Sequence, residues 1–154
     1  MKNYEHNPFH WVNRLGFLSR KRLAHGFRVA GHSVSPEEWA ILLVLWNKGP
    51  QTPSALADVT IKDRTTVTRL IDAMVRKKLV KRAEDPDDRR RSVVIVDTRG
   101  AQIKPDLVSV AQSFTETALD GIPKEDIETT LETLRTMAQN LHTGPQQETN
   151  DDRI

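Results

Sequence analysis

The spacing of hydrophobic residues predicts helices over most of the chain. Apolar residues recur at three- and four-residue intervals between Pro8 and about Ala30, which indicates a long amphipathic helix. Ser35-Pro36-Glu37-Glu38 is a capping box with proline at the first helical position, so a second helix should begin there and end before Gly49-Pro50. Because residues 39–46 are apolar on almost every side, we expect this helix to lie in the core.

Two further helices are predicted between residues 52 and 78. Thr52-Pro53 begins a short helix, whose buried side is expected to comprise Ala55, Leu56 and Val59. The carboxylate of Asp63 can cap the next helix. Its apolar face, defined by three- and four-residue spacing, consists of Val67, Leu70, Ile71 and Met74. Its polar face consists of Thr65, Thr68, Arg69, Asp72 and Arg76, with Arg64 and Thr66 near the N-terminus. This pair of helices predicts a helix-turn-helix.

Two Val-containing runs, residues 79–83 and 92–96, predict the strands of a hairpin. The loop between them contains Pro and Asp, which favour turns, and three consecutive arginines, Arg89, Arg90 and Arg91. A helix with a small polar face beside a basic hairpin is suited to two grooves of a DNA duplex.

The remainder of the chain is predicted to be helical up to a polar tail. Asp97 can cap a helix that extends to about Ala118, and Gly121-Ile122-Pro123 separates it from a last helix over residues 124 to about 141. Apolar residues in the last helix alternate at four- and three-residue spacing, at Ile127, Leu131, Leu134, Ala138 and Leu141. Such a seam indicates packing against a partner helix. Residues 143–154 are polar and are expected to be mobile.

Composition and charge narrow the function classes. The chain has 154 residues, 37% hydrophobic residues and no cysteine, which fits one domain without disulfides or thiolate metal sites. We expect a cytoplasmic protein without a membrane partner, since neither a secretory signal nor a run of roughly 20 apolar residues occurs. Residues 62–91 carry eleven Lys and Arg against six acidic residues. Charge runs are usually solvated faces, but this one coincides with the predicted helix and hairpin, which favours phosphate binding.

The order of these elements resembles the multiple antibiotic resistance regulator (MarR) family of winged-helix transcription factors. The resemblance covers residues 8–142 and is carried by Asp63-Arg-Thr-Thr-Val-Thr-Arg-Leu-Ile-Asp, Leu79-Val-Lys-Arg and Asp85-Pro-Asp-Asp-Arg-Arg-Arg. It implies a mainly α fold with a winged helix-turn-helix at residues 35–97 and a helical dimerisation region at residues 1–34 and 98–142. It also implies a homodimeric repressor that binds a pseudo-palindromic operator in double-stranded DNA. A cleft between the two regions would receive a small aromatic effector, and no cofactor or enzymatic activity is implied.

The resemblance assigns DNA-binding roles to polar residues of the helix and hairpin. Candidates for the major groove are Arg64, Thr65, Thr66, Thr68 and Arg69, which on residue type alone could also form an ordinary polar helix face. Candidates for the minor groove are Arg89, Arg90 and Arg91, with Asp88 expected to hold either Arg90 or Arg69. Thr52 and Ser54 can donate to phosphates or serve only as capping residues.

Two other sets of residues are candidates for dimerisation and effector binding. The expected dimer interface includes Val12, Ile127, Leu131, Leu134 and Leu141. Candidates for an effector cleft are Trp11, Leu15, Trp39 and Leu43, together with Trp46, although large aromatic residues on helices are more often core. His6 and His10 flank a proline and do not predict a metal site.

Three residues depart from the family pattern. Lys78 replaces the usual glycine after the recognition helix, so a left-handed C-cap there would be slightly strained. Asp97 replaces a capping threonine, and Pro105 predicts a kink or a delayed start in the following helix.

Two rival function classes are less well supported by the sequence. A winged-helix protein-interaction module without DNA specificity is disfavoured by the arginine triplet. An enzyme would need a convergent acid–base set, which the sequence does not display.

Overall fold

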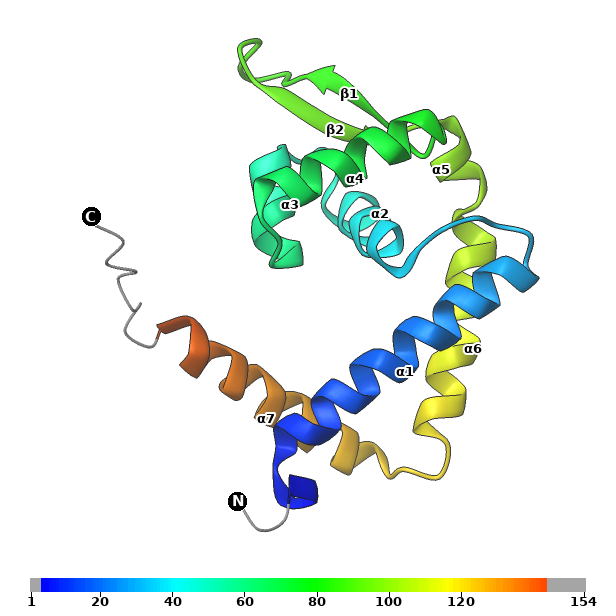
Figure 1. Ribbon diagram of the computed structural model, residues 1–154, viewed down its shortest axis with the longest axis vertical. Helices are drawn as coiled ribbons and strands as arrows, with labels where there is room; N and C mark the ends of the chain where they lie inside the picture. Colours follow the sequence, from blue (N-terminus) through cyan, green and yellow to red (C-terminus); the bar gives the residue numbers. More distant parts are fainter. Residues whose placement is uncertain (1–3, 144–154) are drawn as a thin grey trace, which may run out of the picture. The chain divides into compact units, whose positions relative to one another are not determined.

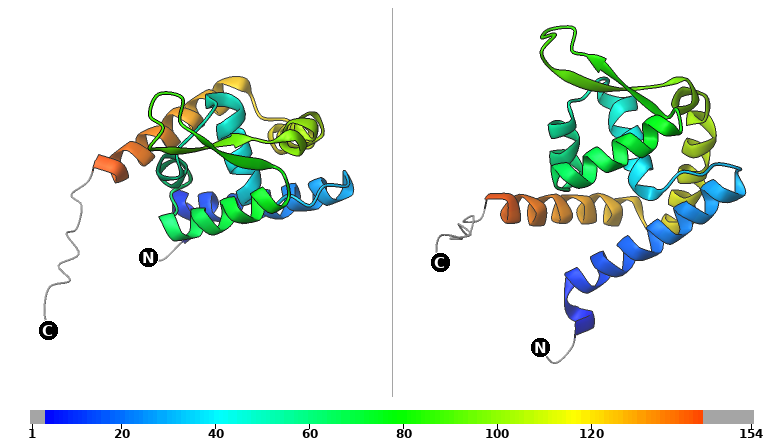
Figure 2. Two further views of the ribbon diagram at one scale, coloured as in Figure 1. Left: turned by 90° about the horizontal axis from the view of Figure 1, so that it is seen from above. Right: turned by 45° about the horizontal axis from the view of Figure 1, so that its top comes forward.

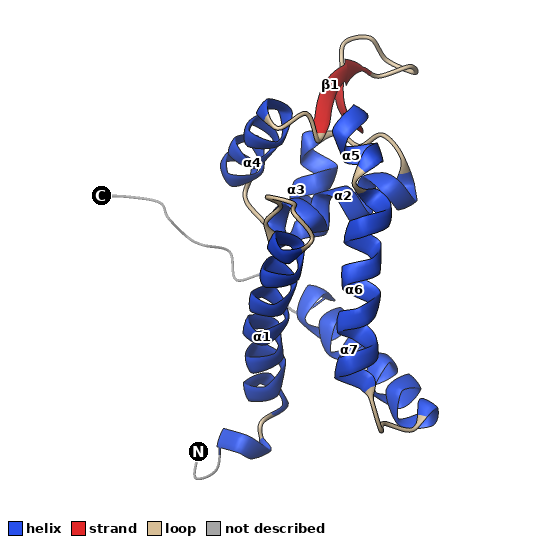
Figure 3. Ribbon diagram, turned by 90° about the vertical axis from the view of Figure 1, so that its right-hand side faces the viewer, coloured by secondary structure: helices blue, strands red, loops and turns tan. Residues whose placement is uncertain are grey.

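The computed structural model describes residues 4–143. In chain order its elements are the 3-10 turn η1 (Tyr4–His6), α1 (Pro8–Val29), α2 (Pro36–Lys48), α3 (Pro53–Thr60), α4 (Arg64–Arg76), β1 (Val80–Glu84), β2 (Ser92–Val96), α5 (Thr98–Gln102), α6 (Lys104–Leu119) and α7 (Lys124–Thr143) (Figure 1). The predicted mainly α fold with one hairpin is therefore confirmed (Figure 3). Apart from Thr143, the predicted tail lies outside the described residues.

The chain forms two compact units. The first is Met1–Glu116 and the second begins at Thr117 and contains α7. The first unit carries the predicted helix-turn-helix and hairpin, and the second carries the predicted apolar seam.

Local capping explains where the helices begin. The Ser35 hydroxyl accepts a hydrogen bond from the Glu38 N–H and the Glu38 carboxylate accepts one from the Ser35 N–H, which confirms the capping box. Thr52 and Asp63 cap α3 and α4 in the same way through their side-chain oxygens. Each of α1, α2 and α3 has proline in its first turn, where no backbone N–H is needed.

Pro105 interrupts the C-terminal helical stretch, as predicted. The turn at Ile103 divides this stretch into the short α5 and the longer α6, with Pro105 at the second position of α6. Proline lacks the N–H that would bond to the carbonyl of Ala101, and its ring displaces that turn. Asp97 caps α5 through a hydrogen bond from the Thr98 N–H.

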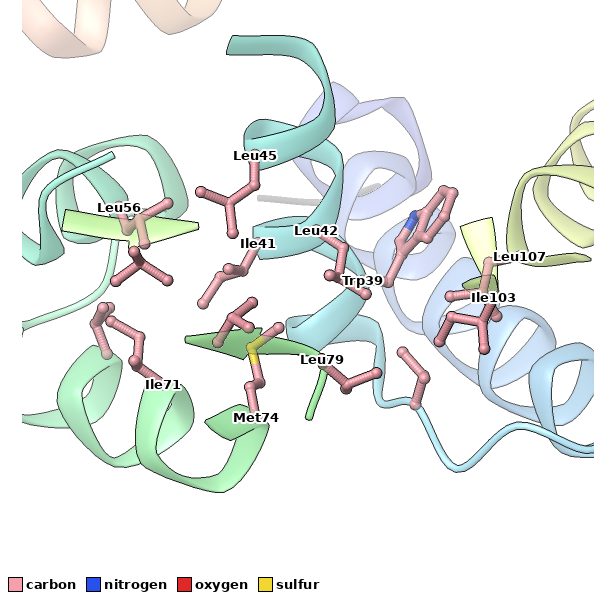
Figure 4. Close-up of a cluster of buried hydrophobic side chains, with 14 of the residues drawn as sticks. Trp39, Ile41, Leu42, Leu45, Leu56, Ile71, Met74, Leu79, Ile103 and Leu107 are labelled. Atoms are coloured by element: carbon pink, nitrogen blue, oxygen red, sulfur yellow. The ribbon is translucent and has the colours of Figure 1, made fainter. Parts of the chain in front are cut away.

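The core of the first unit surrounds α2. Side chains from α3, α4, the hairpin and α6 converge on Ile41, Leu42 and Leu45 (Figure 4). This confirms the prediction that α2 is a central helix, because five of its residues are buried.

One prediction about the core is wrong. Val59 is 45% exposed, whereas Leu56 and Ala57 are the buried residues of α3. The buried face is therefore rotated by about one residue from the expected one, and Thr60 lies on it. Its hydroxyl donates to the carbonyl of Leu56 at 2.6 Å, which lets a polar residue occupy that partly buried position.

The strands pair in antiparallel register from Val80 opposite Val96 to Glu84 opposite Ser92. The first strand begins one residue later than predicted because Leu79 completes the C-cap of α4. Its N–H bonds to the carbonyl of Met74 and the Lys78 N–H bonds to that of Val75, a Schellman motif. Lys78 has a φ of 57°, so the expected left-handed lysine is observed.

Candidate nucleic-acid interface

The helix α4 has the two faces that its sequence predicts. Val67, Ile71 and Met74 are fully buried, and Leu70 packs against the core. The residues on the opposite face are exposed, namely Thr65, Thr68, Arg69, Asp72 and Arg76. Burial of one face fixes the rotation of the helix about its axis, so its polar residues point to solvent.

The N-terminus of α4 is fixed by Asp63. One carboxylate oxygen accepts the Thr66 N–H at 2.8 Å and the other accepts the Thr66 hydroxyl at 2.6 Å. These hydrogen bonds, the hydroxyl first, lower the pKa of Asp63 below its ordinary value of 3.8. Thr66 is a candidate DNA contact, and its hydroxyl proton already donates to the capping carboxylate of Asp63.

The C-terminus of α4 is fixed by a buried carboxylate. Glu38 is 3% exposed, and its carboxylate oxygens lie 2.8 and 3.0 Å from the Lys77 ammonium. Lys77 also donates to the carbonyl of Ser33 at 3.0 Å. The ion pair connects the last turn of α4 to the first turn of α2, and the sequence did not reveal it.

A second ion pair joins α4 to the hairpin. Arg82 on β1 donates to the Asp72 carboxylate on α4 at 2.7 Å. Both side chains are partly exposed, so the pair adds little to stability by itself. It does orient the hairpin relative to the exposed face of α4.

The hairpin has an added third segment. Gln51, in the α2–α3 connection, exchanges two backbone hydrogen bonds with Val94, at 3.1 and 2.7 Å. The central part of β2 is thereby paired on both sides, while the loop of residues 85–91 extends beyond the helices (Figure 2). This bridge could not be predicted from the sequence, because a single residue carries no strand pattern.

The structure resolves which arginine Asp88 holds. Its carboxylate accepts from the backbone N–H and the Nε of Arg90, at 3.0 and 3.3 Å, and its other oxygen lies 3.7 Å from Arg91 Nε. The partner is therefore Arg90 and not Arg69, which was the other expectation. The side chain of Arg90 remains 92% exposed, so its guanidinium retains free donors.

Several basic groups of this surface lack an acidic partner. Among residues 4–143, no salt bridge engages Arg64, Arg69 or Arg89. Arg89, Arg90 and Arg91 also border one shallow hollow beside the hairpin strands. An uncompensated set of guanidinium groups on a helix and an adjacent loop is an arrangement that attracts phosphate.

Thr52 and Ser54 differ in their surroundings. The Thr52 hydroxyl oxygen accepts a hydrogen bond from the Ala55 N–H at 3.1 Å, so Thr52 acts as a capping residue. Ser54 is exposed at the start of α3.

The four residues proposed for an effector cleft do not come together in the described chain. Trp39 is buried in the core and contacts the rings of Phe27 and Trp46, whose centroids lie 5.4 and 5.7 Å away. Trp11 and Leu15 are 49% and 61% exposed on α1. Trp11 lies 16 residues before Phe27, which is about 24 Å along a helix. The core alternative is therefore correct for Trp39, and Leu43 packs against the same cluster.

The expected dimer-interface residues leave apolar surface uncovered. Val12 is 42% exposed on α1, and on α7 the exposed fractions of Leu131, Leu134 and Leu141 are 45%, 39% and 72%. Ile127 is half-buried.

Within residues 4–143, no helix is long and apolar enough to cross a membrane, and no group of three or more acidic or histidine residues is suited to hold a metal.

The chain is similar in sequence to known proteins. Residues 34–92 match the model of the MarR family. The HTH-type transcriptional regulator MhqR of Bacillus subtilis is 24% identical over 109 residues, which is 71% of this chain and 75% of the relative. The HTH-type transcriptional repressor NicR of Pseudomonas putida is 22% identical over 123 residues, 77% of this chain and 78% of the relative.

Solved structures share the fold. BpsR of Bordetella bronchiseptica, whose DNA binding is regulated by 6-hydroxynicotinic acid, superposes with a TM-score of 0.76 at 19% identity. The match covers 90% of this chain and 97% of that one, so the similarity includes the helices on both sides of the winged helix.

Proposed function

We propose that this chain, which matches the MarR family in residues 34–92, is a DNA-binding transcriptional regulator that represses transcription as a homodimer on a pseudo-palindromic operator. Each protomer places the N-terminal half of α4 in a major groove and residues 89–91 in the flanking minor groove. The two copies of α4 lie about one helical turn of DNA apart, roughly 34–36 Å.

The supporting observation is the joint geometry of α4 and the hairpin. Burial of Val67, Ile71 and Met74 turns the polar face of α4 outward, and the Asp72–Arg82 ion pair links that face to the strand leading into the arginine loop. A protein-interaction module would have no need for unpaired arginines on both elements. Arg64 and Arg69 are suited to guanine edges, and Arg90 to a narrow minor groove.

The exposed apolar residues of α1 and α7 support the homodimer. A single chain leaves Val12, Leu131 and Leu134 in contact with water, and the alternating four- and three-residue spacing on α7 is that of a helix that packs against another. We assign these residues to the interface between protomers.

An aromatic effector is assigned to the cluster around Trp46. The indole N–H of Trp46 is buried without a hydrogen-bond partner among the described residues, and the Lys104 ammonium lies 5.6 Å from the centre of its ring. A ligand with an aromatic ring and a carboxylate would bind both groups once the side chains that cover the indole N–H move aside. Titration with 6-hydroxynicotinic acid should quench tryptophan fluorescence, and Trp46→Phe should weaken binding while keeping an aromatic ring at that position.

The DNA-binding proposal is tested by titrating a duplex selected from a random pool, at several salt concentrations. Arg90→Ala should weaken binding by about 1–3 kcal/mol and make it less dependent on salt. Arg28→Ala, which removes the same charge from an exposed position on α1, serves as the control. Equal affinities for Arg90→Ala and the unmodified protein would remove Arg90 from the interface, and failure to select any duplex would remove the proposed function.

A further inference from the structure

Ile61 occupies a backbone conformation that its side chain disfavours. It follows α3 as the C-cap residue with φ and ψ of 52° and 47°, in the left-handed region. A β-branched side chain there is strained, because the Cβ and its branches crowd the backbone. Among the described residues, only Ile61 and Lys78 have a positive φ without being glycine.

The folded chain makes no evident use of the Ile61 side chain. It is 92% exposed, more than any other large hydrophobic residue described. The turn itself is held by backbone groups, since the Ile61 N–H bonds to the carbonyl of Asp58 and the Lys62 N–H to that of Ala57. Glycine or asparagine would adopt this conformation with less strain. Neither burial nor local hydrogen bonding therefore explains why isoleucine occupies this position.

The position of Ile61 suggests what its side chain contacts. It lies in the turn of the helix-turn-helix, two residues before the cap Asp63 and three before the exposed Arg64. It is followed directly by Lys62. An apolar side chain close in sequence to Lys62 and Arg64, at the entrance of α4, suits DNA, which offers phosphates beside apolar C–H groups.

We propose that Ile61 contacts the apolar C–H surface of the operator DNA, a thymine methyl group or a deoxyribose, at the end of α4 that enters the major groove. The inference rests on the proposed DNA-binding function. Isoleucine at this position strains the turn in the free protein, and its side chain contributes affinity for the operator.

Three substitutions separate the two effects. Ile61→Gly and Ile61→Asn should raise the melting temperature by about 2–4 °C, because they relieve the strained conformation. Both should weaken operator binding by about fourfold or more, the equivalent of at least one lost methyl contact. Ile61→Leu, which keeps an apolar side chain without the β-branch, should retain most of the affinity.

The measurements are thermal unfolding, fluorescence anisotropy with selected operator duplex, and light scattering. Higher stability with lower affinity in Ile61→Gly, and recovery of affinity in Ile61→Leu, support the proposal. Unchanged affinity in Ile61→Gly and Ile61→Asn overturns it, and so does a change of oligomeric state, which would place Ile61 in a protein interface. If the unmodified protein binds no duplex, the proposed function fails instead.

Replacing each operator thymine by uracil identifies the contacted group. A position at which uracil lowers the affinity of the unmodified protein but not that of Ile61→Gly marks a thymine methyl. Loss of affinity in Ile61→Gly without any such position marks a deoxyribose. Either result supports an apolar DNA contact.

Discussion

Removal of the Lys77 ammonium tests the importance of the Glu38 ion pair most directly. The substitution Lys77→Met keeps the unbranched apolar stem and the helix propensity but leaves the Glu38 carboxylate buried without its cation. In the structure this carboxylate has two kinds of donor, the Lys77 ammonium and the Ser35 N–H. Only the second remains in the variant.

The expected loss of stability follows from burial. The Glu38 side chain is 4% exposed and that of Lys77 is 37% exposed. Breaking a fully buried pair costs about 3–5 kcal/mol, and the partial exposure of Lys77 lowers our expectation to about 2–3 kcal/mol. For a chain of 154 residues this corresponds to a decrease in melting temperature of about 5–10 °C.

A double-mutant cycle isolates the interaction. Glu38→Gln keeps an acceptor for the Ser35 N–H. The double variant Glu38→Gln/Lys77→Met should therefore lose less stability than the two single variants together, by about 1–2 kcal/mol. Urea unfolding at one fixed protein concentration measures all four proteins.

The matched control is Lys124→Met. Lys124 pairs with Glu128 on α7 at 3.6 Å, with both side chains exposed, so the same substitution should change stability by less than about 0.5 kcal/mol. The Glu38–Lys77 ion pair does not stabilise the fold as expected if Lys77→Met behaves like this control, or if the effects of the two substitutions in the cycle are additive.

Three further predictions concern packing, pH and assembly. Gly100→Ala would place a Cβ 2.1 Å from the carbonyl oxygen of Leu79. We therefore expect thermal unfolding to show a decrease of at least about 2 kcal/mol in the free energy of unfolding. Gly16→Ala is the control, because Gly16 has open space around it, and it should be neutral or stabilising. Because the pKa of Asp63 is lowered in the folded state, its capping interaction stabilises the protein above pH 3.8, and this stabilisation is lost as the pH falls through the folded-state pKa. The unmodified protein should therefore lose stability in acid more steeply than Asp63→Asn. Leu134→Asp should shift the light-scattering mass toward that of a monomer, and an unchanged dimer would exclude Leu134 from the interface.

Much of the helical framework could be predicted from sequence because its signals are local. The capping oxygens of Ser35, Thr52 and Asp63 reach N–H groups three residues away, and Pro105 removes a hydrogen bond within its own helix. The division of α4 into an apolar and a polar face also follows from spacing alone. These interactions exist in any fold that contains the helices, so no tertiary information is needed.

The face of α3 that is buried could not be predicted reliably from the same type of pattern. Eight residues give about two helical turns. Over that length, a face centred on Leu56 and Val59 and one centred on Leu56 and Ala57 fit almost equally well. Docking against the neighbouring helices selected the second and left Val59 in solvent.

By itself, the sequence determined the helices, the two faces of α4, the basic loop and the resemblance to a family of regulators. The tertiary structure decided that Asp88 holds Arg90, that Asp72 binds Arg82 and that Glu38 binds Lys77. It also placed Trp39 in the core and Trp11 on the surface. The physical reason is range: caps and periodic faces act within one or two helical turns, whereas an ion pair between residues 39 positions apart exists only once packing has brought two helices together.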